Sequence, residues 1–77
     1  MLDSKDILVS FGKFIRRNRE KHNINQVDVA NAVGMTQPHY SRIESGERRV
    51  DLDLAIKLCM FVRADLKEFI ADYIEKE

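Results

Sequence analysis

Apolar residues recur along most of the chain at intervals of three and four, which is the spacing of one face of an α-helix. The first such run predicts a helix that is capped by Asp3 or Ser4 and ends near Asn23. Its apolar face consists of Ile7, Leu8, Phe11 and Ile15. Gly12 lies inside this helix at a cost of about 1 kcal/mol relative to alanine. Close packing of the backbone at Gly12 would explain that cost.

Two shorter helices are predicted next, with a tight turn between them. Asn25 is the expected N-cap of the second helix, and Gly34 suits the left-handed turn that ends it. Thr36 is the expected N-cap of the third helix. Pro38 falls in its first turn, where the missing N–H breaks no helical bond. Gly46 is expected to end this helix.

The last third of the chain predicts two strongly apolar helices. Asp51 caps a fourth helix over residues 52–62, which is apolar nearly all round and needs cover on several sides. Asp65 and Glu68 resemble a capping box at the start of a fifth helix. The chain is therefore expected to be all-α, with five helices in a single domain over residues 1–77. The surplus apolar surface predicts an interface between two copies, formed by Met60, Phe61, Phe69 and Tyr73.

The size of the chain supports this expectation of a dimer. A domain of 77 residues is small, and such a domain buries only about 60% of the surface that its unfolded chain exposes. The lone Cys59 cannot form an internal disulfide, and His22, His39 and Cys59 lack the spacing of a zinc site. We expect no metal and no cofactor. No apolar run reaches the roughly 18 residues of a membrane span, and no secretory signal is recognisable, so we expect a cytoplasmic protein.

Charge is distributed unevenly along the chain. Thirteen lysine and arginine residues balance thirteen aspartate and glutamate residues. Residues 13–49 nevertheless hold eight basic and four acidic residues, whereas residues 50–77 hold four basic and seven acidic residues. A phosphate backbone would attract the first segment and repel the second. Charge alone does not separate this interpretation from a surface that merely keeps a small domain soluble.

The two short helices and their glycine turn are typical of an arrangement that places the second helix in the major groove of DNA. On a helical wheel, Tyr40 and Ile43 share the inward side of the third helix. Gln37 can offer a donor and an acceptor to adenine, and Arg42 can bond guanine in a bidentate manner. Such side chains also occur on solvated helices. The outward side of the helix carries Pro38, Ser41, Arg42 and Ser45.

The segments NQVDVA (residues 25–30) and GMTQPHYSRIESG (residues 34–46) resemble the helix-turn-helix family of phage repressors and Cro proteins, also called the xenobiotic-response-element family. The resemblance extends from Phe11 to Ile70. It implies a compact five-helix, lambda-repressor-like DNA-binding domain with a recognition helix over residues 36–45. It also implies that Gln26 bonds a phosphate and braces this helix, and that Arg19 and Glu44 form a structural ion pair.

The residues of the motif fall into two expected roles. The resemblance implies base contacts from Gln37 and Arg42, and the outward side of the third helix adds Pro38 and Ser41 as expected base contacts. Contacts to the DNA backbone are expected from Gln26, His39, Ser45, Arg48 and Arg49. The chain departs from the family at three positions. Tyr40 replaces a smaller aliphatic residue that anchors the helix, and Arg63 stands where glycine is common. Pro38 puts a hydrogen bond from this position to a base in doubt, although Pro38 can touch a thymine methyl group.

These observations favour a sequence-specific transcriptional regulator that binds a roughly palindromic double-stranded operator as a homodimer. The alternative is a protein-interaction module, such as an antitoxin-like partner or a repressor antagonist, whose C-terminal helices bind another protein. An enzyme is not expected, because the chain lacks a glycine-rich phosphate loop and a nucleophile beside a base. No small-molecule ligand is expected either. Phage regulators and controllers of restriction-modification systems both fit the size, and the sequence leaves that choice open.

Overall fold

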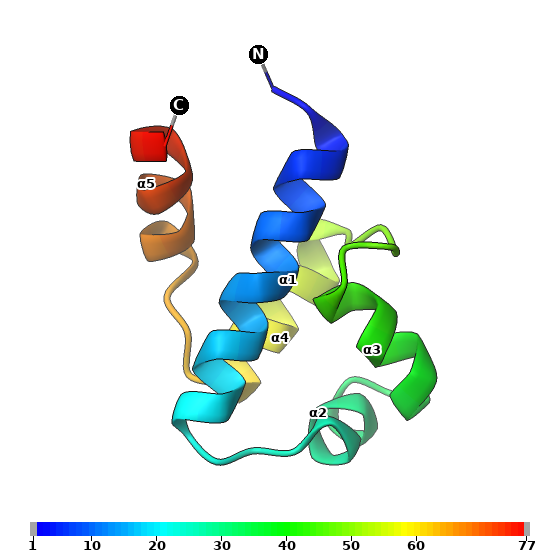
Figure 1. The fold of residues 1–77 in the computed structure, drawn as a ribbon. Helices are drawn as coiled ribbons and strands as arrows, with labels where there is room; N and C mark the ends of the chain where they lie inside the picture. Colours follow the sequence, from blue (N-terminus) through cyan, green and yellow to red (C-terminus); the bar gives the residue numbers. More distant parts are fainter. Residues whose placement is uncertain (1, 77) are drawn as a thin grey trace.

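The computed structural model describes residues 2–76 and contains five helices joined by short connections (Figure 1). No strand occurs among these residues, which confirms the predicted all-α fold. No helix in the same part of the chain is long and apolar enough to cross a membrane. The helices are α1 (Ser4–Lys21), α2 (Gln26–Ala32), α3 (Gln37–Glu44), α4 (Leu52–Phe61) and α5 (Leu66–Lys76).

Polar side chains cap the starts of the helices. In α1 to α4 each cap accepts a hydrogen bond from a backbone N–H two or three residues ahead, at 2.8–3.3 Å. At α5, Asp65 accepts a bond of 2.9 Å from the Lys67 N–H. These bonds satisfy N–H groups that lack a partner in the first helical turn. They confirm the helix starts predicted at Asp3, Asn25, Thr36 and Asp51.

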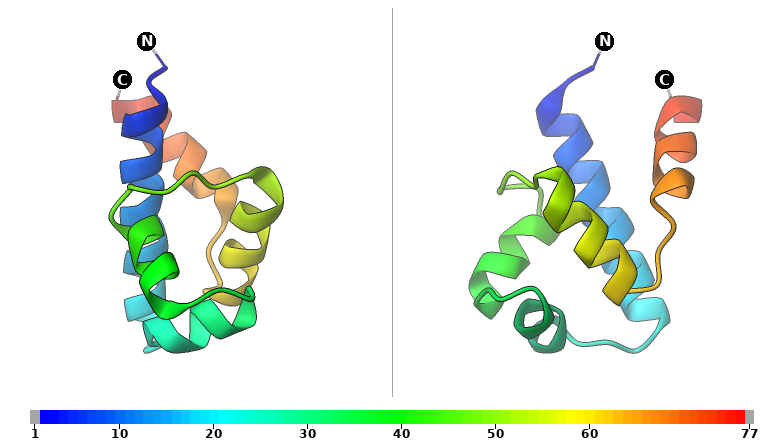
Figure 2. Two further views of the ribbon diagram at one scale, coloured as in Figure 1. Left: turned by 90° about the vertical axis from the view of Figure 1, so that its right-hand side faces the viewer. Right: turned by 180° about the vertical axis from the view of Figure 1, so that it is seen from behind.

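Helix α1 is the element around which the others are arranged. Helices α3 and α5 lie on opposite sides of α1, and α4 lies behind it (Figures 1 and 2). Helix α3 packs against both α1 and α2, while α5 packs against α1. The buried apolar residues lie where these helices meet. They are Phe11, Phe14, Ile15, Val29, Ala30, Tyr40, Ile43, Leu58, Cys59 and Val62.

The end of α3 lies directly on the backbone of α1. A Cβ atom at Gly12 would overlap the backbone carbonyl oxygens of Ile43 and Glu44. Glycine is therefore required at this position by the close approach of the two helices. This contact explains the glycine inside α1, and it fixes the C-terminal end of α3 in the fold.

The turns that follow α1, α2, α3 and α4 each contain a residue in the left-handed region, a conformation that the sequence predicted at Gly34. Asn23, the predicted end of the first helix, has a φ value of +57°. Gly34 and Gly46 have φ values of +74° and +78°. Arg63, at the position where glycine is common in the family, has a φ value of +60°. The next N–H, that of Ala64, bonds the Cys59 carbonyl oxygen at 2.8 Å and closes the end of α4. Arg63 thus adopts a backbone conformation that favours glycine.

Aromatic rings attach α5 to α1. The Phe69 ring lies 5.4 Å from the ring of Phe11 and 5.4 Å from that of Phe14, measured between centroids. Tyr73 continues the cluster at 6.0 Å from Phe69. The sequence predicted both residues at an interface between copies. In the structure they are half-buried and take part in packing within one chain, because α5 folds back along α1.

Candidate nucleic-acid interface

The two sides of α3 differ sharply in exposure. Tyr40 and Ile43 are fully buried on its inner side. Pro38, His39 and Arg42 are exposed on its outer side, as the helical wheel predicted. Gln37 and Ser41 are half-buried between the two sides. The helix is therefore anchored from within and leaves one side open to a partner.

A buried ion pair holds the last residue of α3. The Arg19 Nε atom donates to Glu44 Oε2 at 2.6 Å, and Arg19 Nη2 donates to Glu44 Oε1 at 3.1 Å. Only 10% of the Arg19 side chain and 5% of the Glu44 side chain are exposed. Arg19 Nη1 also donates to the Ile24 carbonyl oxygen at 2.9 Å. The guanidinium thus joins α1, the connection before α2 and the end of α3, with the bidentate geometry that arginine favours.

Tyr40 adds a third donor to the same carboxylate. Its hydroxyl group donates to Glu44 Oε2 at 2.5 Å, one helical turn along α3. Burial, followed by the bond to Glu44, raises the pKa of Tyr40 far above its usual value, so the hydroxyl keeps its proton. A tyrosine in place of a smaller aliphatic residue therefore fills the core and also satisfies part of a buried charge.

Glu44 is held as a carboxylate. Burial raises its pKa, but hydrogen bonds from Arg19, Tyr40 and Gln26 lower it more, and the resulting pKa lies below the ordinary value. The same bond acts on the partner, since the hydrogen bond to Glu44 raises the pKa of Arg19. Both members of the pair are charged at neutral pH.

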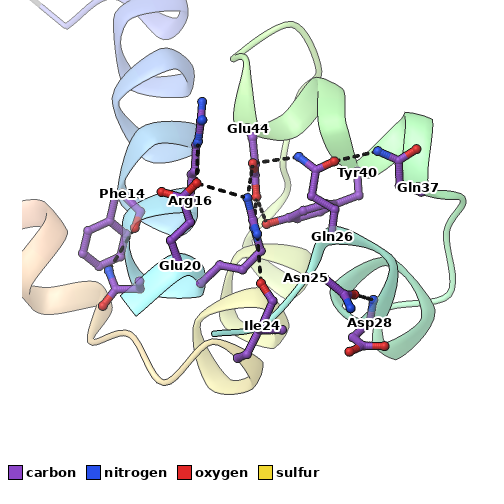
Figure 3. Close-up of polar contacts among 12 residues, drawn as sticks. Phe14, Arg16, Glu20, Ile24, Asn25, Gln26, Asp28, Gln37, Tyr40 and Glu44 are labelled. Atoms are coloured by element: carbon purple, nitrogen blue, oxygen red, sulfur yellow. Dashed lines mark hydrogen bonds and ion pairs between the residues drawn. The ribbon is translucent and has the colours of Figure 1, made fainter. Parts of the chain in front are cut away.

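Two glutamines extend this network to the start of α3 (Figure 3). Gln26 Nε2 donates to Glu44 Oε1 at 2.9 Å. Gln37 Nε2 in turn donates to Gln26 Oε1 at 2.6 Å. Gln26 and Gln37 are the first residues of α2 and α3, so the network joins the two helices of the motif at their N-terminal ends. The carboxamide of Gln37 is thereby held at the edge of the exposed side of α3.

The residues expected at a DNA backbone lie on α2, on α3 and in the connection that follows α3. His39, Arg48 and Arg49 are exposed, and Gln26 is half-buried. Ser45 is exposed as well, and its hydroxyl lies 3.1 Å from the Arg42 carbonyl oxygen and 2.8 Å from Glu47 Oε2. Arg48 and Arg49 lie in the connection between α3 and α4, and Arg49 lies beside Ser4, Ile7 and Leu8 of α1.

Other kinds of site find little support. In residues 2–76, no three histidine, cysteine, aspartate or glutamate side chains are grouped so that they could hold a metal ion. Cys59 is buried in the core, and burial raises the pKa of its thiol. A buried thiol with a raised pKa is a poor nucleophile.

The resemblance implied that Arg19 pairs with Glu44 and that Gln26 braces α3. In the structure, Gln26 bonds both Glu44 and Gln37, so one series of hydrogen bonds joins these residues. The bond from Gln26 to Glu44 was not predicted. The bond from Tyr40 to Glu44 was missed. The four-residue separation of these two residues within a helix was the available signal, because such residues lie on one face.

Comparisons with known proteins agree with this geometry. The helix-turn-helix family HTH_3 matches residues 15–69. The control protein C.MunI of Mycoplasma sp is 34% identical over 73 residues, which cover 94% of this chain and 97% of that protein. The restriction-modification controller protein C.AhdI from Aeromonas hydrophila has a TM-score of 0.71 at 27% identity, covering 80% of this chain and 94% of its own.

The clp gene regulator ClgR from C. glutamicum has a TM-score of 0.80 at 17% identity and covers 91% of each chain. At that identity, the match shows a shared fold. The matched proteins are a gene regulator, a control protein and a restriction-modification controller protein. The resemblance predicted from residues 25–30 and 34–46 is confirmed: the chain belongs to the helix-turn-helix family of DNA-binding transcription regulators.

Proposed function

We propose that this protein regulates transcription by occupying a short, roughly palindromic DNA operator as a homodimer, with α3 of each copy in the major groove. One observation carries the proposal. Helix α3 is anchored by buried Tyr40 and Ile43, while its opposite side is exposed. A rigid helix with one open side suits the major groove, which is wide enough to admit an α-helix.

Base contacts are assigned to the exposed side and the first turn of α3. Gln37 suits adenine, and Arg42 suits the two acceptors of guanine. Ser41 lies one turn after Gln37 and can reach a neighbouring base. Pro38 has no donor, so its contact is with a thymine methyl group.

Backbone contacts are assigned to the surrounding residues. Arg48 and Arg49 follow the end of α3, and their exposed guanidinium groups suit phosphate oxygens. His39 and Ser45 lie at the rim of the exposed side, and Gln26 lies beside Gln37. Such contacts fix the register of α3 on the duplex without reading its sequence.

The dimer is assigned to the apolar face of α4 and α5. Met60 and Phe61 are exposed there, and Phe69 and Tyr73 support α5 from beneath. An apolar groove formed by α1, α4 and α5 adjoins this face. A two-fold axis through the face would place the two copies of α3 about 34 Å apart, one turn of DNA. The other exposed large apolar residues of α4 and α5 are Leu52, Ile56, Ile70 and Ile74.

The biological role is proposed from the relatives. C.MunI is a control protein, and C.AhdI is a restriction-modification controller protein. We propose the same class of role for this chain, acting on DNA in the cytoplasm. Regulation would then depend on the concentration of the protein, because a dimer forms and binds only above a threshold concentration.

Selection of duplexes from a random-sequence pool, followed by affinity measurements, tests the proposal. Arg42→Ala should cost about 1–3 kcal/mol on the selected site and relax the preference at one base pair in each half-site. Arg49→Ala should weaken binding to selected and random duplexes alike. It should also reduce the magnitude of the slope of log binding constant against log salt concentration by about one.

Gln37→Ala should behave like Arg42→Ala at a neighbouring base pair. If neither variant changed the ratio of selected-site to random-duplex affinity, α3 would not be the reading helix. A wild-type protein that enriched no sequence would contradict the proposal as a whole. The antitoxin-like alternative would then be favoured by a heteromeric complex that forms through α4 and α5.

A further inference from the structure

The hydrogen bonds that reach Gln37 begin at a group that can only accept. The Glu44 carboxylate receives bonds from Arg19 Nε and Nη2, from the Tyr40 hydroxyl and from Gln26 Nε2. An ionised carboxylate has about four acceptor positions and no donor. Each neighbour of Glu44 in this network must therefore turn a donor toward it.

This requirement fixes the orientation of Gln26. Its carboxamide must point the NH2 group at Glu44, because the reversed amide would place Oε1 beside a charged carboxylate oxygen. The Gln26 Oε1 atom is then available on the other side, where it accepts from Gln37 Nε2 at 2.6 Å. The orientation is maintained because Glu44 is buried with only 5% of its side chain exposed, and water has little access to replace its partners.

The same logic fixes Gln37. Since its NH2 group donates to Gln26 Oε1, the Gln37 carbonyl oxygen lies at the opposite end of the carboxamide. That oxygen is available as an acceptor, accompanied by the second hydrogen of the NH2 group. A glutamine free in solvent has no such fixed direction, since its amide rotates between the two orientations.

We propose that Glu44, which lies inside the fold, is a positioning residue that sets which end of the Gln37 carboxamide faces the DNA, so that α3 selects a base that presents an exocyclic amine in the major groove, adenine above all. The inference rests on the proposed function of α3 as the reading helix. Adenine offers a donor at N6 and an acceptor at N7, which match the oxygen and the remaining N–H of Gln37. Cytosine offers only the donor, and guanine and thymine present an oxygen acceptor where the Gln37 oxygen would lie.

The first arm of the test identifies the base pair concerned. Wild-type protein selects duplexes from a random-sequence pool, and the pair whose preference disappears in Gln37→Ala is taken as the pair read by Gln37. Four duplexes that differ only at this pair are then titrated by fluorescence anisotropy. Wild type should favour adenine over guanine by about 5- to 150-fold, the range of one bidentate contact.

The second arm reverses the direction of the hydrogen bonds by means of a side chain that has nearly the same shape as glutamate. In Glu44→Gln, the new amide oxygen should face the two donors at Oε2, namely Arg19 Nε and the Tyr40 hydroxyl. Its NH2 group then faces Gln26, so Gln26 and Gln37 both reverse. Arg19 Nη2 loses its acceptor at the same position, so the variant should also have a lower melting temperature. The outward group becomes a donor, and the adenine-to-guanine affinity ratio should fall by about tenfold or more.

Tyr40→Phe is the matched control. It removes one donor from Glu44 in the same core but leaves the charge and the bond from Gln26 in place. This variant should lower the melting temperature and keep the adenine preference. If Glu44 had only a structural role, Glu44→Gln and Tyr40→Phe would both weaken all four duplexes in parallel, and the inference would be overturned.

Gln26→Ala provides an independent variant if Glu44→Gln does not fold. This variant removes the hydrogen bond between Gln37 and Gln26, so the Gln37 carboxamide can rotate. The adenine-to-guanine ratio should fall to within about threefold, well below a full bidentate contact, while preferences that depend on Arg42 persist. Retention of the adenine preference in Gln26→Ala, or a wild-type preference for guanine or thymine at this pair, would overturn the inference while leaving α3 as the reading helix. Failure of wild type to enrich any sequence would instead contradict the proposed function.

Discussion

The helix-turn-helix half of the molecule, residues 4–46, and the C-terminal half, residues 51–76, handle their side chains in opposite ways. In the first half, charged and polar groups such as Arg19 and Glu44 are buried and fully engaged with one another. In the second half, large apolar side chains remain on the surface, with Leu52 70% and Met60 75% exposed. Buried charges need internal partners, whereas exposed apolar groups gain by finding an external one.

The comparison indicates how the two halves divide their tasks. The helix-turn-helix half satisfies its own polar groups, and this fixes α3 relative to α1 before any partner arrives. The C-terminal half has few buried residues in α4, namely Leu58 and Cys59. We infer that its packing is completed by the proposed second copy. Variants in the two halves should therefore fail in different ways.

The largest expected effect is in the helix-turn-helix half. Glu44→Ala leaves the buried Arg19 guanidinium without its counter-charge, which should destabilise the fold by about 3–5 kcal/mol. Chemical denaturation followed by circular dichroism measures this loss. The matched control is Asp53→Ala on the surface of α4, where the ion pair with Lys57 at 3.0 Å is well exposed and should contribute less than about 1 kcal/mol. Equal losses in the two variants would contradict a structural role for the buried pair.

The same pair predicts a dependence on pH. Because the folded state lowers the pKa of Glu44 below its ordinary value of 4.5, its contribution to stability is complete above that pH. The contribution is lost as the pH falls through the folded-state pKa. The difference in unfolding free energy between wild type and Glu44→Gln should therefore narrow below pH 4.5. A difference that stayed constant from neutral pH to pH 3 would show that the fold does not lower the pKa of Glu44.

The next effect concerns the C-terminal half. Ile70→Glu places a charge on the exposed apolar face of α5 and should raise the dimer dissociation constant by about a hundredfold, the effect of losing one central interface residue. Sedimentation equilibrium over a range of concentrations measures this constant. Val27→Glu is the control, because Val27 is similarly exposed but lies on α2 in the other half. Equal weakening by both variants would remove the distinction between the halves.

A smaller effect is expected at the contact between α1 and α3. Gly12→Ala forces a methyl group against the carbonyl oxygens of Ile43 and Glu44 and should cost about 1–3 kcal/mol. Thermal unfolding at fixed protein concentration measures the loss. Gly34→Ala separates steric overlap from backbone strain, because its Cβ atom meets nothing within 4 Å while its φ is +74°. That control should lose about 1 kcal/mol. A larger loss at Gly34 than at Gly12 would contradict the close approach of the helices.

The smallest effect is a gain in stability in the C-terminal half. Arg63 has a φ value of +60°, a conformation that glycine adopts without strain. Arg63→Gly should stabilise the fold by about 0.5–1 kcal/mol. This is the free energy gained by relieving the left-handed strain, minus the cost of the greater flexibility that glycine gives the unfolded chain. Differential scanning calorimetry at one concentration measures it. A lower melting temperature would show that the Arg63 side chain contributes more than its backbone costs.

Local chemistry explains which parts of this structure were predictable from the sequence. The caps at Asn25 and Thr36 were found because a cap depends only on neighbouring residues in the chain. The position of Phe69 was harder to predict. A helical wheel shows that Phe69 lies on an apolar face, but the wheel does not distinguish packing on α1 from packing on a second copy. The direction of the Gln26 and Gln37 amides likewise depends on bonds between residues that are 18 apart in sequence, Gln26 and Glu44, and 11 apart, Gln26 and Gln37.

The positions of the two tyrosines also have a spectroscopic consequence. The chain contains no tryptophan, so its ultraviolet emission comes from tyrosine. Tyr40 lies beside Glu44 in the helix-turn-helix half, and Tyr73 lies beside Phe69 on α5. A Tyr73→Phe chain emits from the first half alone, and a Tyr40→Phe chain emits from the second half alone. Each half of the molecule therefore contains its own optical reporter, and the unfolding of the two halves can be followed separately without an added fluorophore.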